Sequence, residues 1–445
     1  MNESLWRPGG LVSLLGKRIP GQLVIQLTDR CNASCPQCGM RVSQAFARTR
    51  LRRDDVKRIL DAAAMNGVRV VSFTGGEPLL LLNDLVDLIQ YAGRAGIDYI
   101  RTGTNGFFLR RPESAAFESR VRAVAEKLAA TPLRNFWISI DSSLPSVHEG
   151  MRGLPGVIRG IEKALPLFHE CGIYPSANLG INRNLSRETM ADAEKEAGCY
   201  AGSSPQEFYK AYRTGFRRFY RFVEELGFTM VNSCYPMSVG EEEEDGPLAA
   251  IYGAASSERL VGFTPGEKAV LFQALLHAVS ESRHRIRIFS PRSSLYSLAR
   301  QYGGEAGFPY PCRGGIDFFF IDCRDGDTYP CGYRGRENLG KYWDLDGTSR
   351  PRVAECRACD WECFRDPSEL FGPILQGLSH PLALGGRILK EPAFFKLWVA
   401  DILYARACDF FNGRRPPHYS RLGRFQQGDM GHEEDLHLGH QCTVA

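Results

Sequence analysis

Three cysteines lie close together near the start of the chain. Cys31, Cys35 and Cys38 form the pattern CxxxCxxC within the stretch LTDRCNASCPQCGMR. Three thiolates can hold three irons of a [4Fe–4S] cube and leave the fourth iron free for a ligand from outside the protein. A structural zinc site usually closes with four protein ligands, and no fourth Cys or His follows nearby. The spacing therefore indicates an iron–sulfur cluster with one open position.

A second group of cysteines lies in the last third of the chain. Cys312 and Cys331 flank a predicted hairpin, in which IDFFFID is a strand and RDGD holds an Asp-Gly turn signal. The stretch ECRACDWEC then adds Cys356, Cys359 and Cys363. These thiols predict a closed metal site with four ligand places, and their geometry alone allows either zinc or an iron–sulfur cluster.

The elements that must position these groups alternate between short apolar strands and helical patterns. Strands are predicted at 22–27, 68–74, 98–104, 135–141, 174–181 and 228–236. Helices are predicted at 53–65, 83–95, 115–130, 156–170 and 206–226. This order describes a parallel βα barrel or partial barrel, in which chemistry takes place at the carboxyl ends of the strands. The CxxxCxxC loop follows the first of these strands.

Glycines and polar residues follow the other predicted strands. TGGEP comes after the second strand, TGTNG ends the third and WISIDSS ends the fourth. The two glycines would let the backbone approach a ligand, and Glu77 could accept from a positive amino group. The alternative role for Asp141 is that of an N-cap or turn residue. We expect His148 and Arg152 to organise the next loop rather than to catalyse a reaction.

The CxxxCxxC and GGEP motifs, in this order, resemble the radical SAM superfamily, which has a partial (βα)6 barrel. The resemblance covers residues 20–236. It implies a [4Fe–4S] cluster on the three cysteines, with S-adenosylmethionine (SAM) chelating the fourth iron. One electron from a donor such as flavodoxin or ferredoxin would cleave SAM to methionine and a 5′-deoxyadenosyl radical, which abstracts hydrogen from a substrate.

The same resemblance assigns contacts to SAM at the strand ends. In the family the GGEP segment holds the methionyl amino group, so that role passes to Thr74, Gly75, Gly76 and Glu77. Other positions that resemble ligand contacts on the fourth and fifth strands are Ser139, Asp141 and Asn178. Gln37 departs from the family pattern, because many members place there an aromatic residue that packs near the adenine.

The second cysteine group resembles the auxiliary-cluster extensions called SPASM and twitch. Cys312, thirteen residues, Gly326, four residues and Cys331 match the CxnGxxxxC opening of these extensions. Such extensions follow a radical SAM barrel and bind one or two further [4Fe–4S] clusters. The closing half departs from the full SPASM pattern, since Cys408 and Cys442 lie far away. We therefore expect one auxiliary [4Fe–4S] cluster.

The predicted fold class is α/β, with a partial (βα)6 radical SAM barrel followed by a small cysteine-rich auxiliary-cluster domain and C-terminal helices. The predicted divisions are an N-terminal extension (1–20), the barrel (21–240), a helical linker (241–305), the auxiliary domain (306–370) and a helical extension with a polar tail (371–445). The acidic run EEEEDGP at 241–247 marks one of these boundaries.

Composition limits the partners and the location. The chain has 445 residues and a net charge of +4, which is too weak to indicate a nucleic-acid partner. It shows no signal peptide and no apolar stretch of about 18 residues, so we expect a cytoplasmic protein with reduced cysteines. Cys171, Cys199 and Cys234 are expected in the core, and Cys323 is unassigned.

Two function classes compete. The first is a redox enzyme that uses SAM as a radical source on a peptide or small-molecule substrate, with an auxiliary cluster that assists redox chemistry or substrate binding. The second is a non-catalytic iron–sulfur electron carrier or a zinc-stabilised binding module. GGEP and the six-strand order favour the enzyme, because a carrier needs no SAM pocket.

Overall fold

The computed structural model describes residues 14, 16–33, 35–38, 48–187, 204–236, 248–251, 259–345 and 353–426. The acidic run at 241–247, Cys199, Cys442 and the polar end of the chain lie outside the described residues. None of the described helices is long and apolar enough to cross a membrane.

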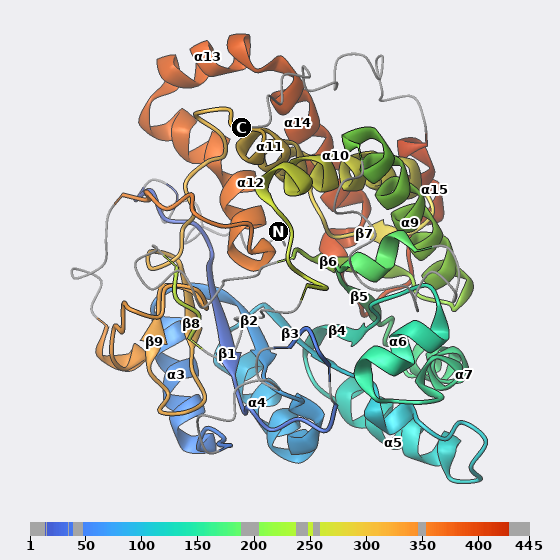
Figure 1. Cartoon of the computed structure of the whole chain (residues 1–445). Coiled ribbons are helices and arrows are strands. Elements are labelled where there is room, and N and C mark those ends of the chain that lie inside the picture. Colours follow the sequence, from blue (N-terminus) through green and yellow to red (C-terminus); the bar gives the residue numbers. More distant parts are fainter. Residues whose placement is uncertain are drawn as a thin grey trace.

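One sheet of nine strands forms the centre of the molecule (Figure 1). Its order is β7-β6-β5-β4-β3-β2-β1-β8-β9, and every neighbouring pair is parallel except β8 and β9. The strands are β1 (Gly21–Gln26), β2 (Val68–Thr74), β3 (Tyr99–Thr104), β4 (Leu133–Ser139), β5 (Ser176–Gly180), β6 (Met230–Cys234), β7 (Arg287–Ile288), β8 (Phe318–Ile321) and β9 (Thr328–Tyr329).

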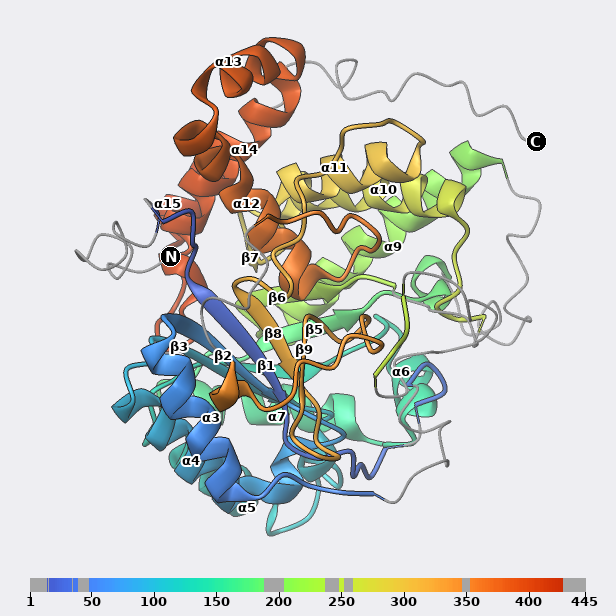
Figure 2. The ribbon, with the colours of Figure 1, turned by 90° about the vertical axis from the view of Figure 1, so that its left-hand side faces the viewer.

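Helices alternate with the strands and then continue beyond them (Figure 2). Those between the strands of the sheet are α3 (Arg53–Met65), α4 (Leu82–Arg94), α5 (Phe117–Ala129), α6 (Pro145–Arg152), α7 (Val157–Glu170), α9 (Pro205–Glu225), α10 (Pro265–Ser282) and α11 (Arg292–Tyr302). The C-terminal helices are α12 (Glu362–Ser379), α13 (Pro381–Lys390), α14 (Pro392–Ala407) and α15 (Tyr419–Leu422). Short 3₁₀ turns are η2 (Pro78–Leu81), η3 (Phe107–Leu109), η4 (Arg183–Ser186), η5 (Tyr342–Asp344), η6 (Asp409–Phe411) and η7 (Gly423–Phe425).

The α/β fold class is confirmed, and the six predicted strands and five predicted helices lie within two residues of their expected bounds. Hydrophobic periodicity explains this agreement. Along β1, Leu23 and Ile25 are buried in the same core as Ile59 and Leu60 of α3, whereas Val24 packs in a second core on the other face. A strand buried on both faces reads as a continuous apolar run, which is typical of parallel sheets.

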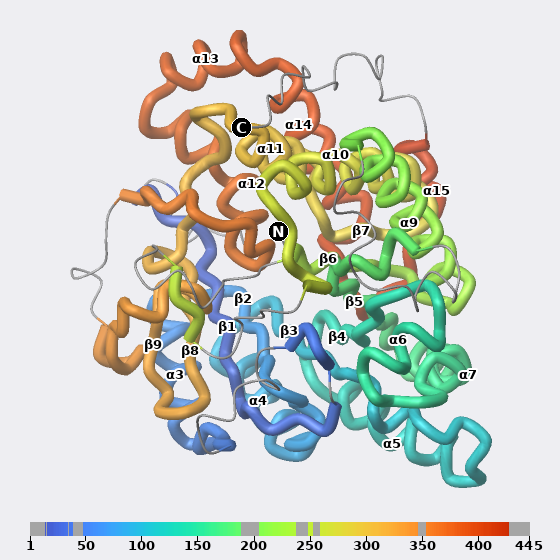
Figure 3. The backbone as a smooth tube through the Cα atoms, viewed as in Figure 1, coloured from blue at the N-terminus to red at the C-terminus, as the bar shows by residue number. Residues whose placement is uncertain are grey.

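The predicted hairpin is present as β8 and β9, but the sequence does not reveal where it attaches. β8 pairs in parallel with β1, with Gln22 opposite Phe318 and Ile25 opposite Ile321. Figure 3 shows these segments, blue and orange in sequence colour, running side by side. The hairpin therefore extends the sheet of the barrel. At the opposite edge, β7 adds a further parallel strand from the region between the barrel and the cysteine-rich segment.

The loop after β1 is fixed against the loop after β2 by backbone hydrogen bonds. The Gly76 N–H donates to the Thr28 carbonyl at 2.7 Å, and the Glu77 N–H donates to the Arg30 carbonyl at 2.8 Å. A Cβ on Gly76 would lie 2.2 Å from the Arg30 carbonyl oxygen, and one on Gly75 would lie 2.4 Å from that of Thr28. Glycine is therefore needed at both positions because backbone atoms of the other loop occupy the space of a side chain.

Substituting Gly76→Ala is expected to destabilise the fold by about 1–3 kcal/mol, because the new methyl group overpacks a backbone contact. The matched control is Gly150→Ala in α6, where nothing lies within 4 Å of the added Cβ. Urea denaturation followed by circular dichroism measures both variants. Equal unfolding free energies for the two variants would contradict the proposed contact.

Candidate functional site

The three cysteines of the CxxxCxxC motif lie in the loop at the carboxyl end of β1. Cys35 is buried, Cys38 is partly buried and Cys31 is exposed. The sulfur of Cys31 accepts from the Ala33 N–H at 3.4 Å and from Nδ2 of Asn105 at 3.6 Å. Such donors stabilise a thiolate or a cluster-bound sulfur. The first cysteine of the motif, Cys31, therefore receives hydrogen bonds from a backbone and a side-chain donor.

Two of these thiols, Cys35 and Cys31, have raised pKa values in the absence of metal. Burial raises the pKa of Cys35 to about 12, and the nearby Asp141 carboxylate and the other two thiols add to the rise while Arg152 opposes it. Partial desolvation by the surrounding loop also raises the pKa of Cys31, although this residue is exposed at the surface, and both Glu77 and Cys38 add to the rise. A metal ligand must be a thiolate, so metal uptake at this loop has to displace protons.

Glu77 of the GGEP motif is buried with both carboxylate oxygens in use. Oε1 accepts from the Leu79 N–H at 3.0 Å, and Oε2 accepts from the Asn105 N–H at 2.7 Å. Burial raises the pKa of Glu77 to about 7, although these backbone donors oppose the rise. Glu77 therefore joins the ends of β2 and β3. Nδ2 of Asn105 in turn donates to the sulfur of Cys31 and to Oδ1 of Asn32, the latter at 2.9 Å. The sequence alone does not single out Asn105 from the TGTNG stretch.

Asp141, just beyond β4, forms the centre of a buried polar network. Its carboxylate accepts two hydrogen bonds from Arg152, at 2.8 and 2.9 Å, and one from Nε2 of Gln37 at 3.1 Å. The Asp141 N–H donates to Nδ1 of His148 at 3.0 Å. Burial lowers the pKa of His148 to about 4, so this ring is neutral at physiological pH. His148 and Arg152 organise the loop as expected, and Gln37 ties that loop to the cysteine motif.

Of the remaining predicted SAM contacts, Thr74 and Ser139 end their strands, and Asn178 lies in the middle of β5. Thr74 ends β2, and its carbonyl accepts from the Leu27 N–H at 2.8 Å. Ser139 on β4 lies opposite Asn178 on β5. Nδ2 of Asn178 donates to the sulfur of Cys234 at 3.3 Å, and Oδ1 accepts from Asn232 at 2.7 Å. These side chains lie on the inner face of the sheet.

In the structure, four cysteines of the second group lie near one another and the fifth, Cys363, lies in different surroundings. Burial raises the pKa of Cys331 well above its ordinary value, and the neighbouring thiols Cys359, Cys312 and Cys356 raise it further. The Cys312 N–H donates to the Cys356 carbonyl at 2.8 Å, which fixes two of these segments together. Cys312, Cys331, Cys356 and Cys359 therefore lie close enough to influence one another electrostatically.

Cys363 faces a different environment. Its sulfur accepts from Nη2 of Arg101 at 3.5 Å, and the thiol donates to Oε1 of Glu362 at 3.6 Å. Burial raises the pKa of Cys363, Glu362 adds to the rise, and Arg101 opposes it. The pKa of Cys234 on β6 is raised by burial, with Glu362 and Cys363 as further causes. Cys363 is thus turned toward the inside of the barrel, where Arg101 and Cys234 reside.

Three other cysteines lie outside both cysteine groups. Cys323 is buried after β8, and the Thr49 hydroxyl donates to its sulfur at 3.7 Å. Cys408 is buried beside Tyr404, and Cys171 is partly buried. No three His, Cys, Asp or Glu side chains of the described residues converge as a single-ion site.

Several known proteins are similar in sequence to parts of the chain. Residues 25–195 match the model of the radical SAM superfamily. The chain is 22% identical to an AdoMet-dependent heme synthase of Methanosarcina barkeri over 71% of this chain and 77% of the synthase. It is 33% identical to a GTP 3′,8-cyclase of Pelotomaculum thermopropionicum over 37% of this chain, a match that spans about half (52%) of the cyclase.

A solved structure of SuiB from Streptococcus suis with S-adenosylmethionine shares 18% identity with the chain. The alignment covers 74% of this chain and 65% of SuiB, with a TM-score of 0.45. The matched residues 25–195 contain the three-cysteine loop, the GGEP segment and the Asp141 network. Enzymes of this superfamily use a [4Fe–4S] cluster and SAM. Residues 25–195, rather than the whole chain, therefore resemble a radical SAM domain.

Proposed function

We propose that the chain reductively cleaves SAM to a 5′-deoxyadenosyl radical and uses it to abstract hydrogen from a peptide or small-molecule substrate. The observation that carries the proposal is the position of Cys31, Cys35 and Cys38 at the carboxyl end of β1, with the GGEP loop bonded to the same segment. When bound on these three thiolates, a [4Fe–4S] cluster supplies the electron and the open iron to which SAM attaches.

The residues around this loop would hold SAM rather than transform it. Thr74, Gly75 and Gly76 would present to the methionyl end those backbone groups that are not already bonded to the loop after β1. Glu77 would act through position, because both of its oxygens already accept backbone hydrogen bonds. Ser139 and Asn178 offer hydroxyl and amide groups from adjacent strands.

Asp141 would contribute mainly by fixing the cysteine loop through Gln37. Its two bonds to Arg152 neutralise the carboxylate and keep it in one orientation. This buried pair links the loop after β4 to the residue that precedes Cys38.

The second metal site is proposed as an auxiliary [4Fe–4S] cluster on Cys312, Cys331, Cys356 and Cys359. Their mutual proximity supports four ligand places from three segments of one region. A redox centre there could accept the electron left on a substrate radical, which zinc could not. Cys363 is left out of this set because its thiol faces Arg101 and Glu362.

Replacing Cys31, Cys35 and Cys38 together with Ala is expected to abolish 5′-deoxyadenosine formation under dithionite, because no thiolates remain to anchor the open cluster. Cys171→Ala, at a partly buried site apart from both groups, is the matched control and should keep the wild-type rate. Chromatography of quenched reactions measures the product. Release of 5′-deoxyadenosine by the triple variant would refute the assignment.

Iron analysis tests the choice of four thiols in the second group. Anaerobically reconstituted protein should hold roughly eight irons per chain, from two four-iron cubes. A variant with Cys312, Cys331, Cys356 and Cys359 all replaced by Ala should hold about four, whereas Cys363→Ala should keep about eight.

Two results of the iron analysis would count against this assignment. A loss of about four irons from Cys363→Ala would return Cys363 to the ligand set. About four irons and one tightly bound zinc in the wild-type protein would make the second site structural.

A further inference from the structure

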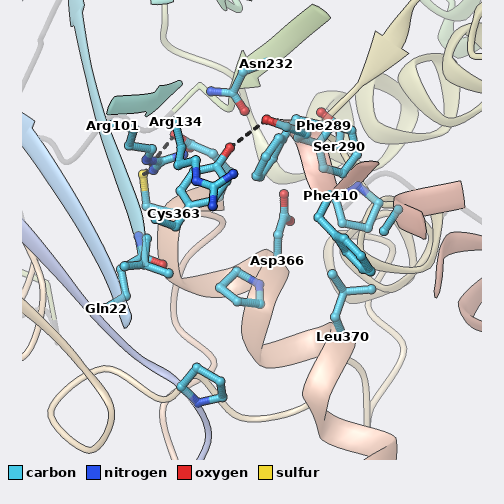
Figure 4. A pocket seen from close by; sticks show the side chains of 18 of the residues that line it. Gln22, Arg101, Arg134, Asn232, Phe289, Ser290, Cys363, Asp366, Leu370 and Phe410 are labelled. Carbon is cyan, nitrogen blue, oxygen red and sulfur yellow. Dashed lines mark hydrogen bonds between the residues drawn. The ribbon is translucent and has the colours of Figure 1, made fainter. Parts of the chain in front are cut away.

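A cavity of about 220 Å³ lies at the opposite end of the strands from the cysteine loop. Its strand side includes Gln22, Val70 and Tyr99, all near the amino ends of β1, β2 and β3. Its other walls come from α12, α14 and η6 (Figure 4). None of the proposed SAM contacts lines it. The cavity, called here the basal cavity, is therefore separate from the site described above.

Three arginines on consecutive strands line the basal cavity. Arg101 belongs to β3, and Arg69 and Arg134 belong to β2 and β4. The pairing of β1 with β2 shifts between Gly21–Val68 and Gln22–Val70, and this shift leaves Arg69 unpaired. The pairing of β3 with β4 shifts in the same way and leaves Arg134 unpaired. Bulges of this kind redirect a side chain, and here each one delivers a guanidinium to the cavity.

Among the described residues, two of these guanidinium groups form no salt bridge, although the charge of Arg101 acts on Glu362 from a distance. Arg69 pairs with Asp98 at 3.5 Å. Arg101 donates instead to the Ser72 hydroxyl at 2.5 Å and to the Cys363 sulfur at 3.5 Å. Within the part of the chain that the structure describes, no Asp or Glu oxygen lies within 4.0 Å of the Arg101 or Arg134 guanidinium. A partly buried guanidinium group without an anion is suited to receive a carboxylate in a two-point contact.

Apolar side chains form much of the remaining wall. Leu370 and Phe371 come from α12, and Phe289 precedes α11. Phe410 and Phe411 lie in η6, where φ is 51° and 57°, a left-handed conformation that is unfavourable for non-glycine residues. Such backbone strain persists only where surrounding contacts hold it, and here it places two aromatic rings at the cavity.

Five carboxyl groups also line the basal cavity. Asp98, Asp401 and Asp409 are each paired with an arginine, so the two on α12, Glu362 and Asp366, limit the charge that the cavity can accept. Asp366 accepts from the Ser294 hydroxyl at 2.6 Å and from the Tyr235 hydroxyl at 3.2 Å. Glu362 accepts from the Tyr235 N–H at 3.3 Å. In Figure 4, Asp366 lies on the helix side, across from Arg101 and Arg134 on the strand side. A ligand with two negative charges would bring one of them toward these oxygens, whereas a single carboxylate can remain at the arginines.

We infer that the basal cavity binds a small organic monocarboxylate with an apolar body, its carboxylate held by Arg101 and Arg134 and its body packed against Leu370, Phe371 and Phe410. The inference does not rest on the proposed radical chemistry, because it concerns a different end of the sheet and different residues. Arg101 also lines a small void inside the barrel with Trp137 and Asn178, so a ligand at this site would lie directly below the interior of the barrel.

Calorimetric titration of the full-length, cluster-reconstituted protein without SAM or reductant tests the inference. The probes are phenylacetate, its uncharged analogue phenylacetamide, and inorganic phosphate. Phenylacetate should bind saturably with a Kd of about 1 mM, and phenylacetamide and phosphate at least tenfold more weakly. The double variant Arg101→Met with Arg134→Met should lose at least tenfold in affinity for phenylacetate.

The matched control is Arg122→Met on the outer face of α5, which should bind phenylacetate like the wild type. Equal binding of phenylacetate and phenylacetamide, tighter binding of phosphate, or no saturable phenylacetate binding would each overturn the inference. If the double variant fails to fold, the comparison of the three probes on the wild-type protein still decides. Failure here leaves SAM cleavage untouched, since the titration contains no SAM.

Discussion

The hydrogen bonds from Gly76 and Glu77 to the Thr28 and Arg30 carbonyls are the contact on which the rest of the site depends. They join the carboxyl ends of β1 and β2 directly before the first cysteine. Because Arg30 adjoins Cys31, any displacement of this contact moves the thiol that receives hydrogen bonds from Ala33 and Asn105. The glycines of GGEP are thus explained by the approach of protein backbone, and not only by the approach of a ligand.

A second constraint acts from the other side of the loop. The buried Asp141 carboxylate is held by Arg152 and receives the amide of Gln37, next to Cys38. The two ends of the motif are therefore tied to different strands, one to β2 and the other to the loop after β4. A site built on three thiolates needs this support, because three ligands constrain its geometry less than four would.

Most strands and helices could be predicted from the sequence, whereas the pairing of distant strands and several side-chain contacts could not. Strands buried on both faces and amphipathic helices have clear periods, so β1 to β6 and the hairpin could be predicted. The pairing of β8 with β1 could not, because it joins residues nearly 300 positions apart without a local signal. The spacing of the five cysteines does not indicate which of them lies outside the proposed ligand set. Cys363 lies outside it because the orientation of α12 turns its thiol toward Arg101. The bulges that expose Arg69 and Arg134 depend on strand register, which residue types do not specify.

Electron paramagnetic resonance of the dithionite-reduced, reconstituted protein, recorded before and after SAM is added, tests the central claim most directly. The claim is that the loop held by β2 and Asp141 carries a cluster with one open iron. SAM is predicted to change the signal of one reduced cluster and to leave that of the auxiliary cluster unaltered. Identical spectra with and without saturating SAM would contradict the account, because no cluster would then have a position open to it.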